Sequence, residues 1–521
     1  MDVRPGVRFA VGGERGTLRF RGAVGGADGE WLGVEWDAPR GKHDGVGPDG
    51  QRYFACAPGH GAFLRASPRI DYGVAFLEAV RAKYTPSSLR TLRTVSVTGQ
   101  APPPALPDPS AVEVRCAYAD AGEAGAIAAT CPAVRWLDLS RSLLTSWDEV
   151  RRIADELPLL ETLLLHEVRL AEPGDVAADA FRGVTHLQMD ASAIDWAHAT
   201  AIARMMPALQ VLQLGANGMR HLAVPDTLLD PGYASAFSAL RELNLAGNGI
   251  DDWQDVCEAL GTLPRLERLV LSENTIASIP APPVRHCYFP MLHDISLREN
   301  PITSWADLDA LEAWLGPHAH THGWSLALGG ERAALAARGS DRDVRLEAIA
   351  RLAHLSVLNR VPVHDEERRD AERYYVARVQ RSASAQSDVD LARAHPRYAA
   401  LCAAQNVPLR PEAAAEAPRT LRAQLVPVRV ASRGTPPDAA AAPALLAADL
   451  AEVPLLCSAP VRLVTRRLAG ALGVPPASVQ EVWAVLRGAE GNDPLLEPLE
   501  ADKALAWYGI AERDVLVLVC R

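Results

Sequence analysis

The stretch LRELNLAGNGI, residues 240–250, decides the fold, because it sets leucines and one asparagine at fixed spacings. The same pattern, L-x-x-L-x-L-x-x-N-x-L, recurs almost unbroken from Leu209, Leu266 and Leu292. The L-x-L alternation predicts a short strand with one buried face, and the asparagine can bond backbone groups in the turn that follows. Each unit can bury its leucines only against the next unit, so the stretch predicts a stacked solenoid.

Weaker copies of the pattern extend this solenoid toward the N-terminus. Their predicted strands begin at Leu137, Leu163 and Leu187, and successive strands along the series start 24 to 31 residues apart. Such a period is typical of leucine-rich repeats, in which each repeat contributes one strand and one connecting segment. We expect residues 112–114 and 326–328 to form the terminal strands, so the predicted repeat domain covers residues 111–330.

The outward face of the predicted strands is the surface on which the repeats would bind a partner. We expect the leucines and asparagines to be structural, together with the tryptophans that follow four of the strands: Trp147, Trp196, Trp253 and Trp305. Outward positions carry mixed charge, which favours a protein partner over a nucleic acid. The candidate contact residues are Trp136, Asp138, His166, Gln188, Gln213, Asn244, Arg268, Ser296 and Arg298.

Composition excludes several other classes of protein. The net charge of −11 over 521 residues argues against a general nucleic-acid binder. We find no apolar run long enough to span a membrane and no secretory segment. Eight scattered cysteines without a C-x-x-C pair indicate reduced thiols. We therefore expect a cytoplasmic protein with no membrane contact.

Residues 1–84 differ sharply from the repeats in amino-acid composition and net charge. Their net charge is +2, whereas the remainder of the chain carries −13, and aromatic residues alternate with glycines. Short apolar strands broken by glycine turns predict a small, strongly bent β-barrel. Within it, the sequence GKHDG at 41–45 predicts a tight loop whose backbone amides can approach a ligand.

This loop is a candidate site for a peptide that ends in acidic residues, an aromatic ring and a free carboxylate. Lys42 supplies a positive charge, and only three lysines stand against 50 arginines in the chain. Aromatic side chains later in the segment could form an apolar wall beside the loop. The candidate site residues are Trp31, Gly41, Lys42, His43, Asp44, Gly45, Phe54 and Phe63.

Three motifs in this segment resemble the CAP-Gly domain family. GKHDG at 41–45, YFAC at 53–56 and GAF at 61–63 are similar to that family's G-K-N-D-G, Y-F-x-C and G-x-F, and the match covers most of residues 1–70. The resemblance implies binding of the acidic-aromatic tail of α-tubulin, or of a similar tail. His43 replaces the usual asparagine and residues 45–50 are one residue longer than typical, so a CAP-Gly fold that has lost tail binding is the alternative.

The remaining segments are predicted as a linker, a helical region and a third domain. Prolines predict a linker over 85–110, and helical spacing predicts a helix from Arg342 to Gln380 within a post-repeat segment of 331–420. Residues 421–521 alternate between strand and helix patterns, with an Ala- and Pro-rich insert at 432–443 expected to be disordered. We expect a helix after Pro460 that Gly473 ends, and a buried strand over 514–519. The order resembles a ubiquitin-like β-grasp domain.

No catalytic constellation emerges from the sequence. His318, His320 and His322 alternate, but no cysteine or carboxylate pair supports a metal site, so we expect a solvated loop. Cys56 and His60 could suggest a thiol nucleophile, but Cys56 falls within the YFAC motif and is expected to be core. No phosphate-binding loop is found. We therefore predict no enzyme, no metal and no cofactor.

The order of the three domains is similar to that of the tubulin-folding cofactor E family, and residues 358–361 and 366–374 resemble its post-repeat helix. The resemblance implies a cytoplasmic, cytoskeleton-associated chaperone that binds α-tubulin. Such a chaperone acts with cofactors B, C and D to assemble or dissociate the αβ-tubulin heterodimer, and the ubiquitin-like domain suggests the proteasome as a further partner. The alternatives are a microtubule-associated adaptor and a ubiquitin-pathway scaffold that use the same modules.

Overall fold

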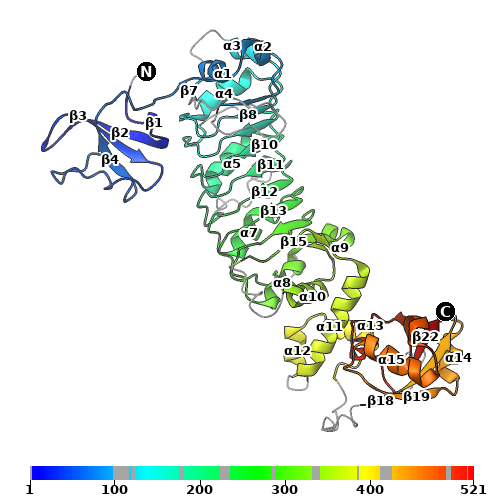
Figure 1. The fold of residues 1–521 in the computed structure, drawn as a ribbon. Coiled ribbons are helices and arrows are strands. Elements are labelled where there is room, and N and C mark those ends of the chain that lie inside the picture. The colour runs from blue at the N-terminus through cyan, green and yellow to red at the C-terminus, as the bar shows by residue number, and fades with distance from the viewer. Residues whose placement is uncertain are drawn as a thin grey trace. The chain divides into compact units, whose positions relative to one another are not determined.

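The computed structural model describes residues 3–97, 116–119, 125–174, 181–222, 235–283, 288–330, 341–383, 387–410, 425–487, 494–512 and 514–521. The chain divides into two compact units, and Figure 1 traces its elements. The first unit consists of residues 1–344 and 354–363, and the second of residues 345–353 and 364–521. Within the described residues, no helix is both long and apolar enough to cross a membrane.

The first unit begins with a four-stranded antiparallel sheet, as the glycine and aromatic pattern predicts. Its strands, in sheet order, are β1 (Arg8–Val11), β2 (Glu14–Val24), β3 (Ala27–Trp36) and β4 (Gly61–Leu64). Gly12 and Gly13 both have positive φ and open the tight turn between β1 and β2. Phe9, Leu18 and Val34 are almost fully buried and form the core on which the strands curve.

The repeats form one sheet in which the predicted leucines point inward. All neighbouring strands run parallel except the last pair, and each strand is in register with the next through its central residue, as in Leu212 opposite Leu243. These central residues are buried. The strands are β6 (Thr94–Ser96), β8 (Trp136–Asp138), β9 (Thr162–Leu164), β10 (His186–Gln188), β11 (Val211–Gln213), β12 (Glu242–Asn244), β13 (Arg268–Val270), β14 (Asp294–Ser296), β15 (Trp324–Ala327), β16 (Leu355–Leu358) and β17 (Val361–Pro362).

The repeated asparagines tie each turn to the preceding repeat. Asn248 is 2% exposed, and its Nδ2 donates to the carbonyls of Leu214 and Leu245, each at 2.9 Å. Its Oδ1 accepts the backbone amides of Asn217 at 2.9 Å and Met219 at 3.2 Å. Four hydrogen bonds from one buried side chain satisfy backbone groups that would otherwise be left unpaired. The structural role predicted for the asparagines is confirmed.

Helices begin at the recurring tryptophans: α4 (Trp147–Asp155), α5 (Trp196–Arg204), α7 (Trp253–Leu260) and α8 (Trp305–Trp314). The residue before each tryptophan is Ser or Asp, and its side chain accepts a backbone amide of the first turn. Trp147, Trp196 and Trp253 are at most 2% exposed, and Trp196 stacks on Phe237 with ring centroids 5.3 Å apart. All four tryptophans therefore start helices, and Trp147, Trp196 and Trp253 also fill the core between repeats, whereas Trp305 is only partly buried.

Both ends of the repeat sheet lie beyond the predicted boundaries. Residues 86–97 were predicted as part of a linker, but they include α2 (Pro86–Leu89) and strand β6, in which Val95 pairs with Leu137. The predicted cap at 112–114 lies outside the described residues. At the other end, β16 and β17 interrupt the helix predicted from Arg342 to Gln380. The short apolar run of β16 fits either a strand or a helix by its pattern alone. It forms a strand because it pairs with β15.

Short elements complete the first unit. They are β5 (Val74–Ala75), which pairs with β7 (Cys116–Tyr118), and the helices α1 (Phe76–Lys83), α3 (Ala126–Thr130) and α9 (Pro317–His322). Helix α10 (Asp341–Arg351) leads into the second unit, which continues with α11 (Asp365–Ala383), α12 (Asp388–Ala394) and α13 (Tyr398–Ala404).

A buried ion network holds the helices of the second unit together. Glu347 is 1% exposed and accepts a hydrogen bond from Arg351 Nε at 2.8 Å, and Arg378 also pairs with it. Arg351 donates to the carbonyl of Ala394 at 3.1 Å and lies 3.1 Å from His395 Nδ1. Because buried charges are tolerated only when paired, this network fixes how the helices pack.

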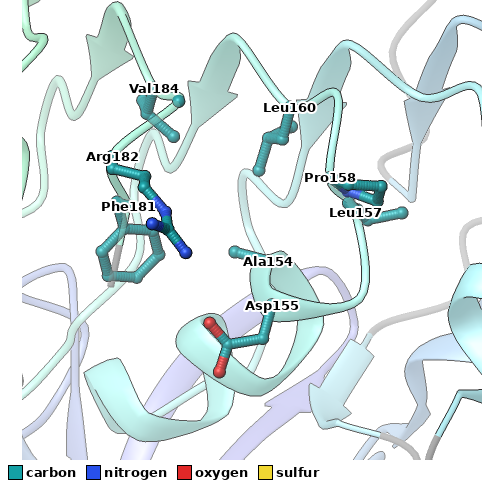
Figure 2. A pocket seen from close by; sticks show the side chains of 9 residues that line it. Ala154, Asp155, Leu157, Pro158, Leu160, Phe181, Arg182 and Val184 are labelled. Atoms are coloured by element: carbon teal, nitrogen blue, oxygen red, sulfur yellow. The ribbon is translucent and has the colours of Figure 1, made fainter. Parts of the chain in front are cut away.

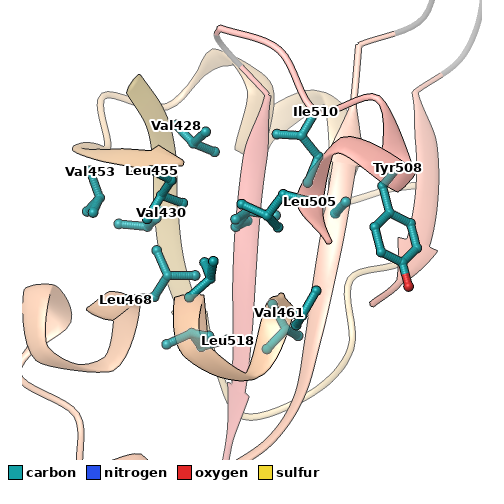
Figure 3. Packing of buried hydrophobic residues seen from close by; sticks show 14 of the residues in the cluster. Val428, Val430, Val453, Leu455, Val461, Leu468, Leu505, Tyr508, Ile510 and Leu518 are labelled. Atoms are coloured by element: carbon teal, nitrogen blue, oxygen red, sulfur yellow. The ribbon is translucent and has the colours of Figure 1, made fainter. Parts of the chain in front are cut away.

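The chain ends in a five-stranded mixed sheet of order β19-β18-β22-β20-β21, with a parallel central pair, β18 and β22. Its strands are β18 (Leu425–Arg433), β19 (Ala451–Leu456), β20 (Val479–Leu486), β21 (Leu495–Pro498) and β22 (Val515–Cys520), with short 3-10 turns at 476–478 and 505–508. Helix α15 (Val461–Leu472) packs on one face through Val461, Val464 and Leu468, and Figure 3 shows this core. Gly473, with φ of 65°, ends the helix as predicted.

The insert between β18 and β19 was predicted to be disordered, and this is wrong. Residues 434–450 are described, and they include helix α14 (Ala442–Ala447). Ala442 is fully buried against Val485, Val515 and Val517 of the sheet. An Ala- and Pro-rich composition predicts disorder only when the segment has no apolar surface to cover.

Candidate functional site

The GKHDG loop is joined to strand β4 by backbone hydrogen bonds. The amides of Lys42 and His43 donate to the Gly61 carbonyl at 2.8 and 3.3 Å, and the Gly61 amide donates to the His43 carbonyl at 2.8 Å. A Cβ atom at Gly41 would lie 2.3 Å from the Gly61 oxygen. At Gly45, which has φ of +102°, it would lie 1.9 Å from the Phe54 oxygen. Both glycines are therefore required by the close packing of the loop.

Aromatic rings gather beside this loop. The ring of Phe63 lies 5.0 Å from His43, 5.6 Å from Phe54 and 5.7 Å from Tyr53, measured between ring centroids. Phe20 in turn lies 5.0 Å from Tyr53. We call the surface formed by Lys42, His43, Tyr53, Phe54 and Phe63 the aromatic surface. Phe20 and Tyr53 were not among the predicted site residues. Tyr53 stands in the YFAC motif and could have been included, whereas the place of Phe20 depends on its pairing with Gly33.

Trp31 lies on the same side of strand β3 as this surface but contacts a different partner. Gly33 pairs with Phe63 across the strands, so Trp31, two residues earlier, falls opposite Arg65. The Arg65 guanidinium lies 3.9 Å from the centre of the Trp31 ring. This cation–π pair extends the aromatic surface with a second positive charge, which the sequence alone did not identify.

The charges around the loop leave Lys42 unneutralised. Lys42 is exposed, and none of the described residues forms an ion pair or hydrogen bond with its side chain. Asp44, in contrast, pairs with Arg52 at 2.6 Å, and that hydrogen bond lowers the pKa of the Asp44 carboxyl. The aromatic surface therefore presents a positive charge to an approaching anion.

His43 is a neutral hydrogen-bond donor within this surface. Burial lowers the pKa of its imidazole despite the nearby Asp44 charge. Its Nδ1 accepts the Gly45 amide at 3.0 Å, so the proton of the neutral ring resides on Nε2. Phe54 is 8% exposed and belongs to the core beneath the surface, whereas Tyr53 and Phe63 are partly exposed. A cation, a neutral donor and partly exposed rings form a combination suited to a carboxylate next to an aromatic ring.

The same region holds no reactive thiol. Burial and the negative charges of Glu35 and Asp44 raise the pKa of Cys56, so the side chain stays a thiol at neutral pH. A thiolate is the nucleophilic form of cysteine. His60 Nδ1 lies 2.8 Å from the Trp36 carbonyl, which occupies the ring in a structural bond.

The structure places the predicted repeat-face residues along one ladder of strands. Gln188, Gln213 and Asn244 are directly opposite one another on β10, β11 and β12 and are half-buried. Trp136, His166 and Ser296 are also partly exposed, and Arg268 and Arg298 are exposed. Arg268 pairs with Asp294 at 2.8 Å and with Glu242 at 3.8 Å.

Asp138 does not belong to the exposed face. It is 6% exposed, and its carboxylate accepts hydrogen bonds from Ser96 Oγ at 2.8 Å and from the Ser140 amide at 2.9 Å. The alternation within β8 predicts an outward side chain at Asp138. Strand β6, which was not predicted, pairs with β8 and covers this side chain. Asp138 joins the first strand of the sheet to the second.

The alternating histidines lie on helix α9, so the prediction of a loop is wrong, but His320 and His322 are exposed to solvent as expected. His318 stacks on His322 with ring centroids 4.5 Å apart and lies 5.4 Å from His293. Burial, and then the neighbouring His322 and His293, lower the pKa of His318. Over the residues that the structure describes, no group of three or more His, Cys, Asp or Glu side chains is placed to hold a metal ion.

A pocket elsewhere on the repeats has no chemistry of this kind (Figure 2). It is lined by the end of α4 and the turns of two repeats, residues 154–155, 157–158, 160 and 181–184. Figure 2 labels two charged side chains, Asp155 and Arg182, and Asp155 is already paired with Arg151 at 2.6 Å. The N-terminal aromatic surface is therefore the stronger candidate site.

Comparisons with known proteins identify relatives of the N-terminal domain and of the chain as a whole. The CAP-Gly domain family matches residues 4–68. "Tubulin-specific chaperone E" of Bos taurus is 32% identical over 461 residues, 82% of this chain and 84% of that protein, and the Homo sapiens protein of the same name is 31% identical over 460 residues, with the same coverage. "Tubulin-folding cofactor E" of Arabidopsis thaliana is 26% identical over 411 residues, 74% of each chain. Among solved structures, a TLR13–ssRNA13 complex is 17% identical, with a TM-score of 0.32, over 50% of this chain and 40% of that one. With curated relatives above 30% identity along most of its length, the chain belongs to the tubulin-specific chaperone E family.

Proposed function

We propose that this protein is a tubulin-folding chaperone that captures the carboxy-terminal tail of α-tubulin on the aromatic surface. The observation that supports this proposal most strongly is the unneutralised charge of Lys42 beside the stacked rings of His43 and Phe63. The tail carboxylate would bind Lys42 and the Nε2–H of His43. Its aromatic ring would pack against Phe54 and Phe63, with acidic residues near Arg65.

The repeats would then hold the body of α-tubulin. Their half-exposed amide row, Gln188, Gln213 and Asn244, offers donors and acceptors with little charge. A contact of this kind depends on shape and hydrogen bonding more than on long-range attraction. Two separate contacts on one chain raise the effective concentration of the second once the first is made.

We further propose that residues 425–521 form a ubiquitin-like β-grasp domain. The strand order β19-β18-β22-β20-β21, the parallel central pair and the single helix α15 across one face support this assignment. Such a domain would recruit another factor, either one of the cofactors B, C and D or the proteasome. The protein would act in the cytoplasm, in association with the cytoskeleton, by assembling or dissociating the αβ-tubulin heterodimer without enzymatic activity of its own.

The tail step is tested by binding of a peptide with the last residues of α-tubulin. Lys42→Ala should weaken binding at least tenfold, because it removes the unneutralised cation. Arg69→Ala removes an equal charge from an exposed position of the same barrel and should leave binding unchanged. Equal affinities of the Lys42→Ala variant and the parent would rule out tail capture.

A separate assay distinguishes a chaperone from a microtubule adaptor. The parent protein is mixed with αβ-tubulin dimers, and the fraction of free α-tubulin is measured by native electrophoresis. A chaperone that processes dimers should change that fraction. Co-sedimentation with microtubules while dimers stay intact would favour the adaptor.

A further inference from the structure

Helix α11 has two sides of different character. Tyr375 and Val379 are almost fully buried on one side. Asp370, Arg373 and Tyr374 are only partly buried and lie on the other side, because residues three and four positions apart share one side of a helix. These three residues, which we call the charged strip, combine an acid, a base and an aromatic ring. The contacts of the charged strip lie farther along the chain.

The charged strip pairs with side chains of residues 425–521, which we call the last domain. Asp370 forms an ion pair with Lys503, and Arg373 forms an ion pair with Glu497. The two pairs have opposite polarity, because the helix provides the acid in one and the base in the other. Charges arranged in this way fix the register of the contact, since a slip would bring like charges together.

An aromatic contact lies beside the ion pairs. The rings of Tyr374 and Trp507 have centroids 6.0 Å apart. Lys503 Nζ lies 5.1 Å from the centre of the Trp507 ring and donates to Glu500 at 2.8 Å. Lys503 therefore contacts the acid of the strip, the ring, and an acid of its own domain, and it is the side chain on which the whole contact converges.

The contact is small, and the last domain does not need it for its core. All residues of the hydrophobic cluster around α15 lie within 426–520. The side chains of the two ion pairs are 15–31% exposed, so water reaches them. An ion pair of this kind shifts an equilibrium by about fivefold or less. A small, polar contact between two parts of a chain permits them to move relative to each other.

The side chains of the contact also leave polar atoms unsatisfied. Trp507 Nε1 and Glu497 Oε2 are buried, and neither has a hydrogen-bond partner among the described residues. A buried polar atom without a partner costs free energy, because it gives up its hydrogen bond to water. The ion pairs must offset this cost, so the docked position of the last domain is only slightly favoured.

We propose that this contact is a latch governed by the charge of Lys503, and that loss of this charge releases the last domain from α11. Lys503 is the only lysine in residues 84–521. A modification that removes the charge of a lysine, such as acetylation, would therefore act on the latch at a single residue. Release would open the side of the domain around Trp507 to partner proteins. The proposal does not depend on tubulin binding.

The first experiment tests whether the latch is closed in the full-length protein. A carbodiimide joins an amine to a carboxylate in direct contact, so mass spectrometry should find an amide link between Lys503 and Asp370. The link between Lys503 and Glu500, within one domain, is the internal reference. Relative to it, the first link should fall about threefold or more between about 50 mM and about 500 mM salt, because salt screens exposed pairs. Absence of the link to Asp370, or a ratio independent of salt, would overturn the proposal.

The second experiment tests the role of the charge. An Arg373→Lys variant serves as the reporter, because the same reagent can join the introduced amine to Glu497. Adding Lys503→Gln should lower the yield of this link about threefold or more, whereas Lys503→Arg keeps the charge and should leave the yield unchanged. Lys503→Glu combined with Asp370→Lys reverses the ion pair and should restore the yield. Equal yields in the Lys503→Gln and Lys503→Arg reporters would contradict control by the charge.

Two controls separate release of the latch from other effects. Arg462→Gln removes another cation of the last domain, one that is 66% exposed, and should leave the yield of the reporter unchanged. A fall as large as that of Lys503→Gln would mean that total charge governs the contact, and would overturn the proposal. Hydrogen exchange of residues 515–519 in β22 should match the parent in the Lys503→Gln variant. If β22 loses protection, Lys503 is required for the fold of the domain and the proposal is wrong.

Discussion

The imidazole of His43 lies against the phenyl ring of Phe63, with ring centroids 5.0 Å apart and ring planes inclined by 29°. Stacking and the hydrogen bond from the Gly45 amide together fix the orientation of the ring. Burial lowers the pKa of His43, so the imidazole is neutral at neutral pH. The loop therefore presents a neutral donor at the position where CAP-Gly domains usually have asparagine.

Two substitutions of His43 separate its role in stacking on Phe63 from its role as a neutral hydrogen-bond donor. His43→Asn keeps a neutral donor but loses the stacking on Phe63, which in general contributes about 0.5–1.5 kcal/mol. We expect affinity for the tail peptide to fall by about threefold, and His43→Ala, which loses both, to reduce it by at least tenfold. Isothermal titration calorimetry measures both. A His43→Ala variant with the affinity of the parent would mean that the ring does not contact the tail.

Gly45→Ala should disrupt the loop. Its φ of +102° and the 1.9 Å approach of a Cβ atom to the Phe54 oxygen leave no room for a methyl group. We expect a loss of more than about 2 kcal/mol in the free energy of unfolding of the barrel. Gly26→Ala is the matched control, because Gly26 has φ of +77° with open space around it and should cost about 1–2 kcal/mol. Thermal unfolding of the two variants measures the difference, and equal losses would contradict the steric argument.

Substitution of two asparagines in one repeat should reduce the free energy of unfolding by very different amounts. Asn248→Ala removes four hydrogen bonds to buried backbone groups, and we expect it to destabilise the solenoid by about 3 kcal/mol or more. Asn244 is half-exposed, and among the described residues its Oδ1 accepts one backbone amide, that of Ala246, so Asn244→Ala should cost about 1 kcal/mol or less. Urea unfolding gives both values. The Asn244→Ala variant should stay folded but bind tubulin more weakly than the parent protein.

Glu347→Gln should destabilise the second unit strongly. The substitution leaves Arg351, which is 4% exposed, without its carboxylate, and breaking such a buried pair costs about 3–5 kcal/mol. The control is Glu372→Gln, because the partner of Glu372, Arg397, is 26% exposed at 3.1 Å and can be hydrated, so we expect about 1 kcal/mol. Hydrogen exchange in α10 and α11 reports the difference. Similar protection in both variants would show that the ion pair contributes little.

The second unit should lose stability in mild acid through His395. Burial and the charges of Arg351 and Arg378 lower the pKa of His395 to about 4, whereas the unfolded imidazole titrates near about 6.5. The unfolded chain therefore binds the proton first. Stability from this group is fully present above pH 6.5 and falls as the pH drops toward 4.

The measurement compares unfolding midpoints of the parent and His395→Gln between pH 4.5 and 8. The difference between the two curves should be constant above about pH 6.5 and change below it. Tyr375, whose hydroxyl lies 2.8 Å from His395 Nδ1, keeps a polar partner in the variant, because the glutamine amide takes the place of the imidazole. Parallel curves over the whole range would contradict the lowered pKa.

The repeats could be predicted because their signal is local and repeated. Leu243 or Leu269 can be buried only if the next repeat stacks on it, so the spacing fixes strand, register and solenoid together. The helix of the last domain was equally clear, since Val461 to Leu472 is periodic and Gly473 stops it. The motif glycines likewise located the loop at 41–45.

Elements that were missed depend on contacts with distant residues. β6 has only Thr94–Ser96, with no leucine pattern, and becomes a strand because Val95 pairs with Leu137 at the open edge of the sheet. Helix α14 was missed because alanines and prolines give no amphipathic signal. The uninterrupted apolar run of β22 did carry the information, since a strand buried on both faces requires a cover on each.

Among the site residues, too, those set by a local motif were predicted, and those set by contacts with distant residues were missed. Lys42, His43, Phe54 and Phe63 lie together because the motif that predicted them also folds them. Arg65 was missed because its place over Trp31 depends on strand pairing. Cross-strand neighbours cannot be read from spacing along one strand.

The isolation of Lys42 also makes it a natural attachment point for chemical labels. Lys503 is 16% exposed and paired with Glu500, and Lys83 is half-buried. Among the three lysines of the chain, an amine-reactive dye therefore reaches Lys42 first. A ligand bound at the loop would shield that amine, so the rate of labelling would report occupancy of the native protein without any mutation.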